Sequence, residues 1–299
     1  MRKHPVLLAI MVFGILLGLF LVSIWALSFI PSEEKITWGG EKIAVLEIRG
    51  VIVDPEPVVE KLIKFRKNAK VRAIILRIDS PGGGVGPAQE IYAEVKKVKR
   101  EKKVLVSMGS VAASGGFYIA CAADKVLANP GTLTGSIGVI VETLNVEELF
   151  RKLGLRAEVV KSGKHKDIGS PTRPMTEEDR RMLQSVIDSV HEQFIKAVAE
   201  GRKLPLEKVR ELADGRIFSG EQAKSLGLID DLGTLEDTIA LATQMAGIKG
   251  EPEVIYPEKK RFSLLELLLK ESIQKFWESV AENSPQLYFL FTSPPGQIQ

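Results

Sequence analysis

Two glycine-rich stretches carry the residues best suited to covalent chemistry. Residues 79–84 read DSPGGG, and residues 112–116 read AASGG. Ser114 stands between Ala113 and Gly115, so a substrate backbone could approach its hydroxyl closely. A serine at such a turn can act as a nucleophile, and the amides after it can stabilise an oxyanion. Each stretch alone also fits an ordinary tight turn or a phosphate cradle, but neither matches a P-loop or dinucleotide-binding pattern.

A serine nucleophile needs a general base, and the chain offers few histidines for that role. His4 precedes a long apolar run, and His191 falls inside a predicted helix. Residues 161–167 read KSGKHKD; in an extended segment, His165 would point away from Lys166. A lysine can replace histidine if its pKa falls from about 10.4 by roughly three units, at a cost near 4 kcal/mol. Burial can supply that shift, but the residues alone leave Lys166 as one surface lysine among many.

The elements that must position these residues follow from periodicity. Apolar, β-branched runs predict strands at residues 43–53, 73–78, 104–108, 125–128 and 157–160. Helical patterns are seen at residues 57–67, 86–99, 117–121, 176–202, 206–213, 220–226 and 234–246. Strands that alternate with helices predict an α/β fold with a largely parallel, covered sheet. Both glycine-rich stretches follow strands, so we expect them to meet at the carboxyl edge of that sheet.

The amino terminus has the pattern of a membrane anchor. Residues 6–30 carry no charge and are almost all apolar, and about 20 helical residues span a bilayer. Basic residues precede this run and two glutamates follow it, which predicts a cytoplasmic amino terminus and an extracytoplasmic remainder. A cleaved secretory signal is the alternative, although its apolar part is usually about 7–15 residues long.

Composition limits the other possibilities. The 299 residues include 41 basic and 38 acidic ones, a net charge of +3, which gives no general reason to expect nucleic acid as a partner. The single cysteine, Cys121, excludes an intrachain disulfide. Residues 262–280 are amphipathic; they could pack on the domain, on a neighbouring subunit or on a membrane surface. Residues 286–299 contain apolar side chains that suggest docking into a groove.

Four motifs in order resemble one known family. They are residues 79–84, residues 113–116 (ASGG), residues 134–138 (TGSIG) and residues 162–168 (SGKHKDI). Together they resemble the signal peptide peptidase A (SppA) family, peptidase family S49, in its short single-domain form found in archaea and Gram-positive bacteria. The resemblance covers roughly residues 43–246.

The resemblance implies a fold and a set of roles. The fold is α/β, Clp-protease/crotonase-like, with repeated ββα units. Ser114 would be the nucleophile, Lys166 the general base, and Ser136 the hydroxyl that orients the lysine. The amides of Gly83 and Gly115 would form the oxyanion hole. No metal or cofactor is implied.

The resemblance also implies a biological setting. Family members cut remnant signal peptides, and sometimes misfolded chains, at the membrane, and they assemble into rings that are commonly octamers. Whether Ser114 and Lys166 act within one subunit or across two stays open. Small residues around Ser114 favour small or apolar side chains at the cleavage point. We therefore expect apolar peptides and the lipid bilayer as partners, and a single-pass protein of the cell membrane.

The expected organisation has five segments. They are a cytoplasmic start (1–5), a transmembrane signal-anchor helix (6–30), a linker (31–42), a Ser-Lys peptidase domain (43–250) and a C-terminal amphipathic helix with its tail (251–299). Three other functions remain open. The first is a related Ser-Lys membrane protease that trims a stomatin-like partner or misfolded membrane proteins. The others are a crotonase-type acyl-CoA enzyme and an inactive scaffold that binds apolar peptides.

Overall fold

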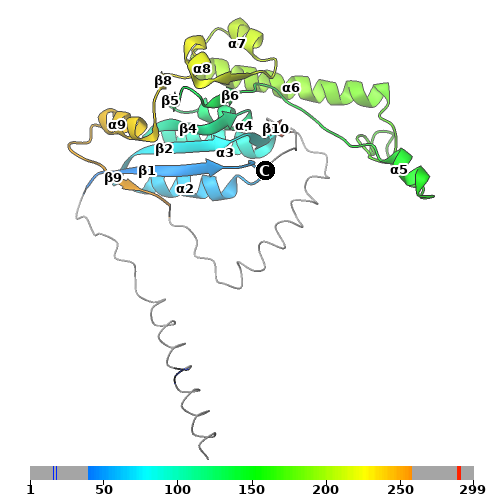
Figure 1. Ribbon diagram of the computed structural model, residues 1–299, viewed down its shortest axis with the longest axis horizontal. Coiled ribbons are helices and arrows are strands. Elements are labelled where there is room, and N and C mark those ends of the chain that lie inside the picture. Colours follow the sequence, from blue (N-terminus) through cyan, green and yellow to red (C-terminus); the bar gives the residue numbers. More distant parts are fainter. Residues whose placement is uncertain (1–15, 17, 19–39, 258–287, 291–299) are drawn as a thin grey trace, which may run out of the picture. The chain divides into compact units, whose positions relative to one another are not determined.

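The computed structural model describes residues 40–257 and 288–290, together with the single positions 16 and 18 (Figure 1). The chain divides into two units, Met1–Gly40 and Glu41–Gln299, and the second contains all the elements named below.

The membrane-related segments fall largely outside this part of the chain. Within the described residues, no helix is both long enough and apolar enough to cross a membrane. The predicted anchor at residues 6–30, apart from positions 16 and 18, lies outside them, and so does the predicted helix at residues 262–280. Both stay predictions.

The strands confirm most of the predicted ones. The strands are β1 (Lys42–Arg49), β2 (Val71–Ser80), β3 (Gly82–Gly84), β4 (Lys103–Ala113), β5 (Lys125–Ala128), β6 (Leu133–Gly135), β7 (Ile217–Ser219), β8 (Asp231–Leu232), β9 (Glu253–Ile255) and β10 (Tyr288–Leu290). The strand predicted at residues 157–160 is wrong, because these residues are exposed and pair with no strand. Strand propensity stabilises a strand only where the side chains pack against neighbouring strands.

The helices agree more closely with the prediction. The helices are α2 (Glu56–Lys67), α3 (Val85–Lys99), α4 (Gly115–Ala120), α5 (Glu147–Lys152), α6 (Glu177–Arg202), α7 (Leu206–Leu212), α8 (Gly220–Leu226) and α9 (Leu235–Ala246). The sequence predicts all of these except α5. Capping boxes start α6, α8 and α9 at Thr176, Ser219 and Thr234, which explains why their first residues were predictable.

One large sheet forms the centre of the second unit. Its strand order is β7-β6-β4-β2-β1-β9, and β5 pairs with both β4 and β8 beside this path. All of these pairs are parallel except the antiparallel pair of β6 with β7. The predicted largely parallel α/β sheet is therefore confirmed.

Helices cover both faces of the sheet (Figure 1). On β1, Ile43 and Val45 face the apolar cluster that α9 covers, while Ala44 and Leu46 face the larger cluster that includes α2 and α3. All four side chains are fully buried. This explains the continuous apolar run in the sequence, since a strand buried on both faces needs no polar side.

The strand β4 connects the core of the sheet to the serine. Its residues Leu105–Ser107 pair with β5, and its last residues, Val111–Ala113, pair with β6. One ββα unit consists of the consecutive elements β2, β3 and α3. The strand β4 pairs with both β5 and β6 and is followed directly by α4. This long strand delivers Ser114 to the carboxyl edge of the sheet.

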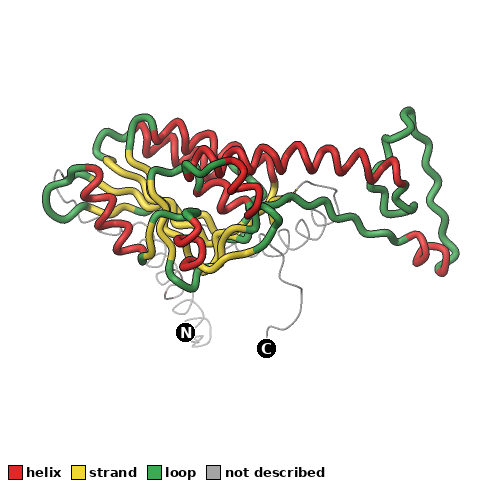
Figure 2. Tube along the Cα trace, turned by 90° about the horizontal axis from the view of Figure 1, so that it is seen from above, coloured by secondary structure: helices red, strands yellow, loops and turns green. Residues whose placement is uncertain are grey.

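A long excursion between β6 and α6 leaves the sheet. We call residues 140–175 the arm; it contains α5. Figure 2 shows the arm and the amino-terminal part of α6 extending beyond the strands. Several apolar arm residues are exposed: Ile140, Leu144, Leu149, Leu153, Leu155, Val159 and Val160.

Helix α6 accordingly has two different halves. In its carboxyl half, Phe194, Ile195 and Val198 are buried in the core. In its amino half, Met182 and Val186, which continue the same apolar stripe along the helix at intervals of four residues, are exposed. An apolar stripe of this kind normally faces a core, so the amino half lacks a covering surface within the described chain.

Candidate active site

Ser114 lies at the junction of β4 and α4, as the N-cap residue of the helix. Its φ of 51° and ψ of −116° form a conformation that a non-glycine residue holds only when its surroundings impose it. Its amide donates to the carbonyl of Gly135 at 2.8 Å, and its carbonyl accepts from the amide of Tyr118 at 2.8 Å. The side chain is buried, and its Oγ has no hydrogen-bond partner among the described residues. A buried hydroxyl without a partner is available to a substrate.

Ser136 lies next to this serine because β6 pairs with the end of β4. It directly follows Gly135, whose carbonyl accepts the Ser114 amide. Ser136 is also buried and also has a φ of 51°, and its amide donates to the carbonyl of Arg216 at 2.8 Å. A Cβ on Gly135 would lie 2.5 Å from the ring of Phe218, so a glycine is required here. The two serines are thus brought together by backbone contacts.

Gly83 is the middle residue of β3. The Ile52 amide donates to the carbonyl of Gly82, and the Gly84 amide donates to the carbonyl of Ile52, each at 2.8 Å. Alternate residues of a strand direct their N–H and C=O groups to opposite edges, so the N–H and C=O of Gly83 face the other edge of β3. A Cβ on Gly83 would lie 2.2 Å from the Ile52 oxygen, which excludes any other residue without a backbone shift.

That other edge of β3 is paired with β10. The two strands are antiparallel, and Phe289 lies opposite Gly83. β10 also contacts α4, the helix that follows Ser114 (Figure 1). The edge therefore accepts an extended segment beside the serine. The alternative of a phosphate cradle is wrong for this stretch, because its backbone is an extended strand paired on both edges.

The two glycine-rich stretches meet, as the sequence predicts. Ser80 pairs with Ala112 across β2 and β4. A Cβ on Gly116 would lie 3.2 Å from the Ser80 oxygen, so α4 starts directly against the first stretch. Asp79 stabilises the contact between the two stretches, because its Oδ1 accepts a hydrogen bond from the Val111 amide at 3.1 Å. No role was predicted for Asp79, although its place at the head of the DSPGGG motif was a usable signal.

Lys166 lies on an exposed turn of the arm. Lys161 Nζ and Lys164 Nζ, the nearest lysines, form ion pairs at 2.5 Å with Asp167 and Glu178. In the described part of the chain, no carboxylate pairs with the Lys166 amine. Of these three lysines, Lys166 is therefore the one whose amine has no ion-pair partner among the described residues.

Neither of the two described histidines, His165 and His191, is hydrogen-bonded to the Ser114 hydroxyl. Residues 164–169 form turns, so the alternation of side chains in an extended segment does not apply to His165 and Lys166. His165 Nε2 consequently lies 3.6 Å from Glu178, the same side chain that Lys164 contacts. His191 lies within α6, as predicted, and His4 is outside the described residues.

Within one chain, the Lys166 turn is held far from the serine. Its neighbours bind Glu178, at the start of α6. Phe194, further along α6, packs edge-on against Tyr118 of α4, with ring centroids 5.1 Å apart. About 24 Å of helix axis separates Glu178 from Phe194. The structure thus brings together Ser114, Ser136, Gly83 and Gly115, but not Lys166.

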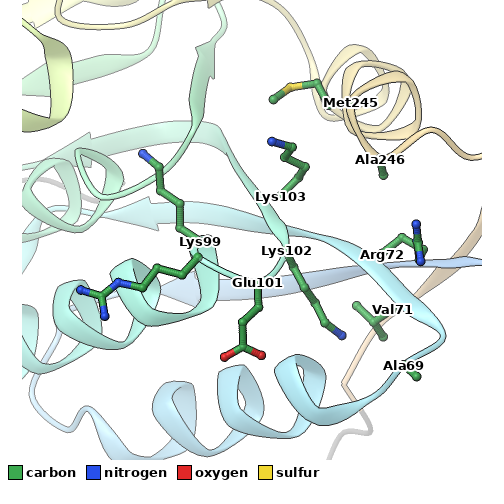
Figure 3. Close-up of a pocket in the computed structure, with 10 residues that line it drawn as sticks. Ala69, Val71, Arg72, Lys99, Glu101, Lys102, Lys103, Met245 and Ala246 are labelled. Atoms are coloured by element: carbon green, nitrogen blue, oxygen red, sulfur yellow. The ribbon is translucent and has the colours of Figure 1, made fainter.

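A separate cavity of about 330 Å³ lies at the opposite end of the strands (Figure 3). Basic side chains dominate its lining: Arg72, Lys99, Arg100, Lys102 and Lys103. Lys103 starts β4, whereas Ser114 follows its last residue, so roughly 35 Å of strand separates the two ends. Lys102 has a structural role, because its amine donates hydrogen bonds to the carbonyl oxygens of Phe65 and Asn68 at the end of α2. This cavity is not part of the serine site.

Comparison with known proteins agrees with this arrangement. The model of Peptidase family S49 matches residues 96–249, and the Clp protease family model matches residues 53–133. The second match runs from α2 to β5 and includes β4 and α4, which supports a Clp-protease-like α/β fold.

Curated relatives give the same result. The chain is 46% identical to a protein of Synechocystis sp. named as a protease, over 70% of this chain and 76% of that one. It is 34% identical to a protein of Methanocaldococcus jannaschii, also named as a protease, over 85% and 86% of the two chains. It is 36% identical to a protein of Enterococcus faecium named signal peptide peptidase SppA, over 70% and 65%.

These relatives also decide between the chemical alternatives. The family and the three relatives described above are named as peptidases, and the family match includes the strand and helix that hold Ser114. A crotonase-type acyl-CoA enzyme is thereby disfavoured. The chain belongs to peptidase family S49, the SppA family, and is a serine-type peptidase.

Proposed function

We propose that this protein is a membrane-bound serine endopeptidase that uses a Ser114–Lys166 dyad to degrade remnant signal peptides. The observation that carries the proposal is the buried, unpartnered hydroxyl of Ser114 on a strained turn. Such strain, kept by the surrounding backbone contacts, is typical of functional sites. The signal-peptide substrate rests on the family and on the name of the Enterococcus relative.

The proposed chemistry is acyl transfer. The neutral Lys166 amine takes the proton of Ser114 as its Oγ forms a bond to the peptide carbonyl carbon. The amides of Gly83 and Gly115 donate to the oxyanion. The peptide C–N bond then breaks, and protonated Lys166 gives its proton to the leaving amine. Water hydrolyses the acyl-enzyme through the same steps, with Ser136 orienting the amine.

The edge of β3 supports a peptide substrate. β10 pairs there in antiparallel register, with Phe289 opposite Gly83. An extended peptide that replaced β10 would use the same backbone hydrogen bonds, as in other cases of strand addition. Its carbonyl would then lie between the Gly83 amide and Ser114.

We infer that Lys166 reaches the serine of a neighbouring subunit. In its own chain the Lys166 turn is tied to the far end of α6, and the amine is exposed. A lysine base must be removed from water to be neutral, and a neighbour could bury it. The exposed apolar residues of the arm support such a contact. So does a hollow of about 570 Å³ between the arm and α6, lined in part by Val141, Met175 and Leu183.

Site variants of the full-length chain in detergent test the dyad. In Ser114→Ala and Lys166→Ala, kcat/KM for a fluorogenic signal peptide should fall by about 10³-fold or more. Lys224→Ala is the control, since it removes a lysine that is paired with Asp231 on a helix outside the arm. His165→Ala should also retain activity. Substantial activity in Lys166→Ala would remove the dyad.

Mixing inactive subunits tests the contact between chains. Ser114→Ala and Lys166→Ala chains, unfolded together and reassembled, should regain activity, because some sites then combine an intact serine with an intact lysine. Absence of regained activity, in assemblies of the same size as the wild type, would place both residues in one subunit.

The substrate is tested separately from the chemistry. In liposomes, the protein should cleave a released signal peptide faster than an intact membrane protein with a similar apolar segment. Faster cleavage of the intact protein, with Ser114 still required, would favour a role in trimming membrane partners.

A further inference from the structure

Arg173 occupies the centre of an ion-pair network on the arm. Its Nε and Nη2 donate to the two carboxylate oxygens of Asp167, each at 3.0 Å. Nη1 donates to Asp179 at 2.6 Å and to the Pro174 carbonyl at 2.9 Å, and Nη2 also donates to the Asp167 carbonyl at 3.2 Å. A guanidinium has five N–H donors, so every one of them is used. A lysine cannot reproduce this planar, five-bond arrangement.

The network connects two separate parts of the chain, the first turn of α6 and the turn that contains Lys166. Asp179 is buried in the first turn of α6, where it accepts the Thr176 amide at 3.1 Å as part of the capping box. Asp167 directly follows Lys166 in the chain. Arg173 therefore connects the start of a 26-residue helix to the residue next to the proposed base.

The network also determines which charges surround Lys166. Asp167 is the carboxylate adjacent to it in the sequence, and a carboxylate near an amine favours the protonated form, which cannot act as a base. Both Asp167 oxygens are occupied by Arg173, and Oδ1 also accepts from Lys161 at 2.5 Å. Glu178, which the same turn contacts, is paired with Lys164 at 2.5 Å, and His165 Nε2 lies 3.6 Å from it. Lys166 is thus left without a carboxylate partner among the described residues.

This arrangement exceeds what a surface loop needs. Exposed ion pairs contribute little to stability, and isolated pairs are common on surfaces. Here the side chains are largely shielded, with exposures of 27% for Arg173, 12% for Asp167 and 4% for Asp179. A shielded, fully satisfied network holds one geometry, which is what a group that must align with a reacting atom requires.

We propose that Arg173 is a positioning residue for this peptidase. By bridging Asp167 and Asp179, it holds the Lys166 turn against the start of α6 and keeps the Asp167 carboxylate away from the Lys166 amine. The inference rests on the proposed role of Lys166 as general base.

The first test compares Arg173→Ala with Arg210→Ala in the full-length protein. Arg210 forms a two-bond pair with Glu192 further along the same helix, so it is a matched control. In Arg173→Ala, kcat should fall by about 10²-fold with little change in KM, as expected for a misplaced group. Arg173→Lys should recover only part of this loss. Arg210→Ala should keep wild-type kcat.

The pH profile separates positioning from general loss of structure. In Arg173→Ala, the acidic limb of kcat/KM should move to higher pH, because the freed Asp167 carboxylate favours the protonated amine. In Arg173→Ala combined with Asp167→Asn, the limb should return to the wild-type pH while kcat stays low. A merely structural role would lower activity without moving the limb.

The outcomes distinguish this inference from the proposed function. Activity retained in Lys166→Ala removes the proposed base itself. Loss of activity in Lys166→Ala, with Arg173→Ala matching Arg210→Ala in kcat and pH profile, overturns the role of Arg173 alone. Should Arg173→Ala not assemble, Arg173→Lys gives the same two readouts, and wild-type values in it overturn the inference.

Discussion

At the scale of single residues, backbone strain is concentrated beside the nucleophile. In the described part of the chain, positive φ occurs at three non-glycine residues, Ser114, Ser136 and Lys203. Lys203 only ends α6, whereas the two serines meet at the end of β4. Strain of this kind costs of order 1–3 kcal/mol per residue and persists only where the surroundings impose it. The pairing of β4, β6 and β7 is what imposes it here.

Cys121 provides a prediction at the same scale. The residue ends α4 and is fully buried, and this burial raises the pKa of its thiol to about 12. At pH 8 only about one thiol in 10⁴ would then be ionised, and the thiolate is the reactive form. We expect thiol reagents neither to label the native protein nor to inhibit its activity. In denaturant, one thiol per chain should react; stoichiometric labelling of the native protein would contradict this.

At the scale of elements, β4 leads to the nucleophile, and the start of α6 anchors the turn that carries the proposed base, Lys166. Ser114 follows β4 at the edge of the sheet. The Lys166 turn is attached through the Lys164–Glu178 ion pair to the start of α6, and it is the other end of this helix that packs in the core. The first turn of α6 is acidic, which suits the positive end of a helix and also provides the carboxylates that hold the turn. Helix capping and the positioning of the turn therefore use the same residues.

Acid should weaken this connection within a defined range of pH. Hydrogen bonds from Arg173 hold the pKa values of Asp167 and Asp179 well below the ordinary value of about 3.9. A lowered folded-state pKa stabilises the fold above the unfolded-state value, and this stabilisation is lost as the pH falls below it. The difference in unfolding free energy between wild type and Arg173→Ala should be constant from about pH 7 to pH 5 and shrink below about pH 4.

Urea denaturation at several pH values measures this difference. Lys208→Ala, which removes an exposed charge from α7, serves as the control and should show no such dependence. A difference that is already lost between neutral pH and pH 5 would contradict the ion-pair account.

At the scale of the whole molecule, one chain does not bring the proposed base to the serine. The serine, its neighbouring hydroxyl and the proposed oxyanion amides lie together, while the proposed base is exposed on the arm. The arm and the amino half of α6 expose apolar side chains that lack a covering surface among the described residues. Both features have one explanation if a second copy packs against the arm.

A charge placed on the arm should therefore prevent assembly and activity together. Val160 is fully exposed, so Val160→Asp should leave the fold of one chain intact. If a neighbour covers this residue, the buried carboxylate would be costly, and the assembly should dissociate. Light scattering after size exclusion, with circular dichroism and peptidase assays, measures the three effects. Tyr256→Asp, at an exposed position outside the arm, should leave size and activity unchanged.

The sequence by itself determined the features that depend on short-range patterns. Continuous apolar runs and their alternation with helical patterns predicted a covered parallel sheet, and helical periodicity predicted α6, α8 and α9. The glycine-rich turn identified Ser114, because a small-residue junction between a strand and a helix can be recognised within a few neighbouring residues.

Only the tertiary structure decided the features that depend on distant residues. The contact of Ser114 with Gly135, the pairing of Gly83 with β10, and the bridge from Asp167 through Arg173 to Asp179 each join separate stretches of chain. Local propensity misjudged residues 157–160 for the same reason, since a strand requires a partner. The free amine of Lys166 likewise became visible only once the carboxylates around it were seen to be occupied by other side chains.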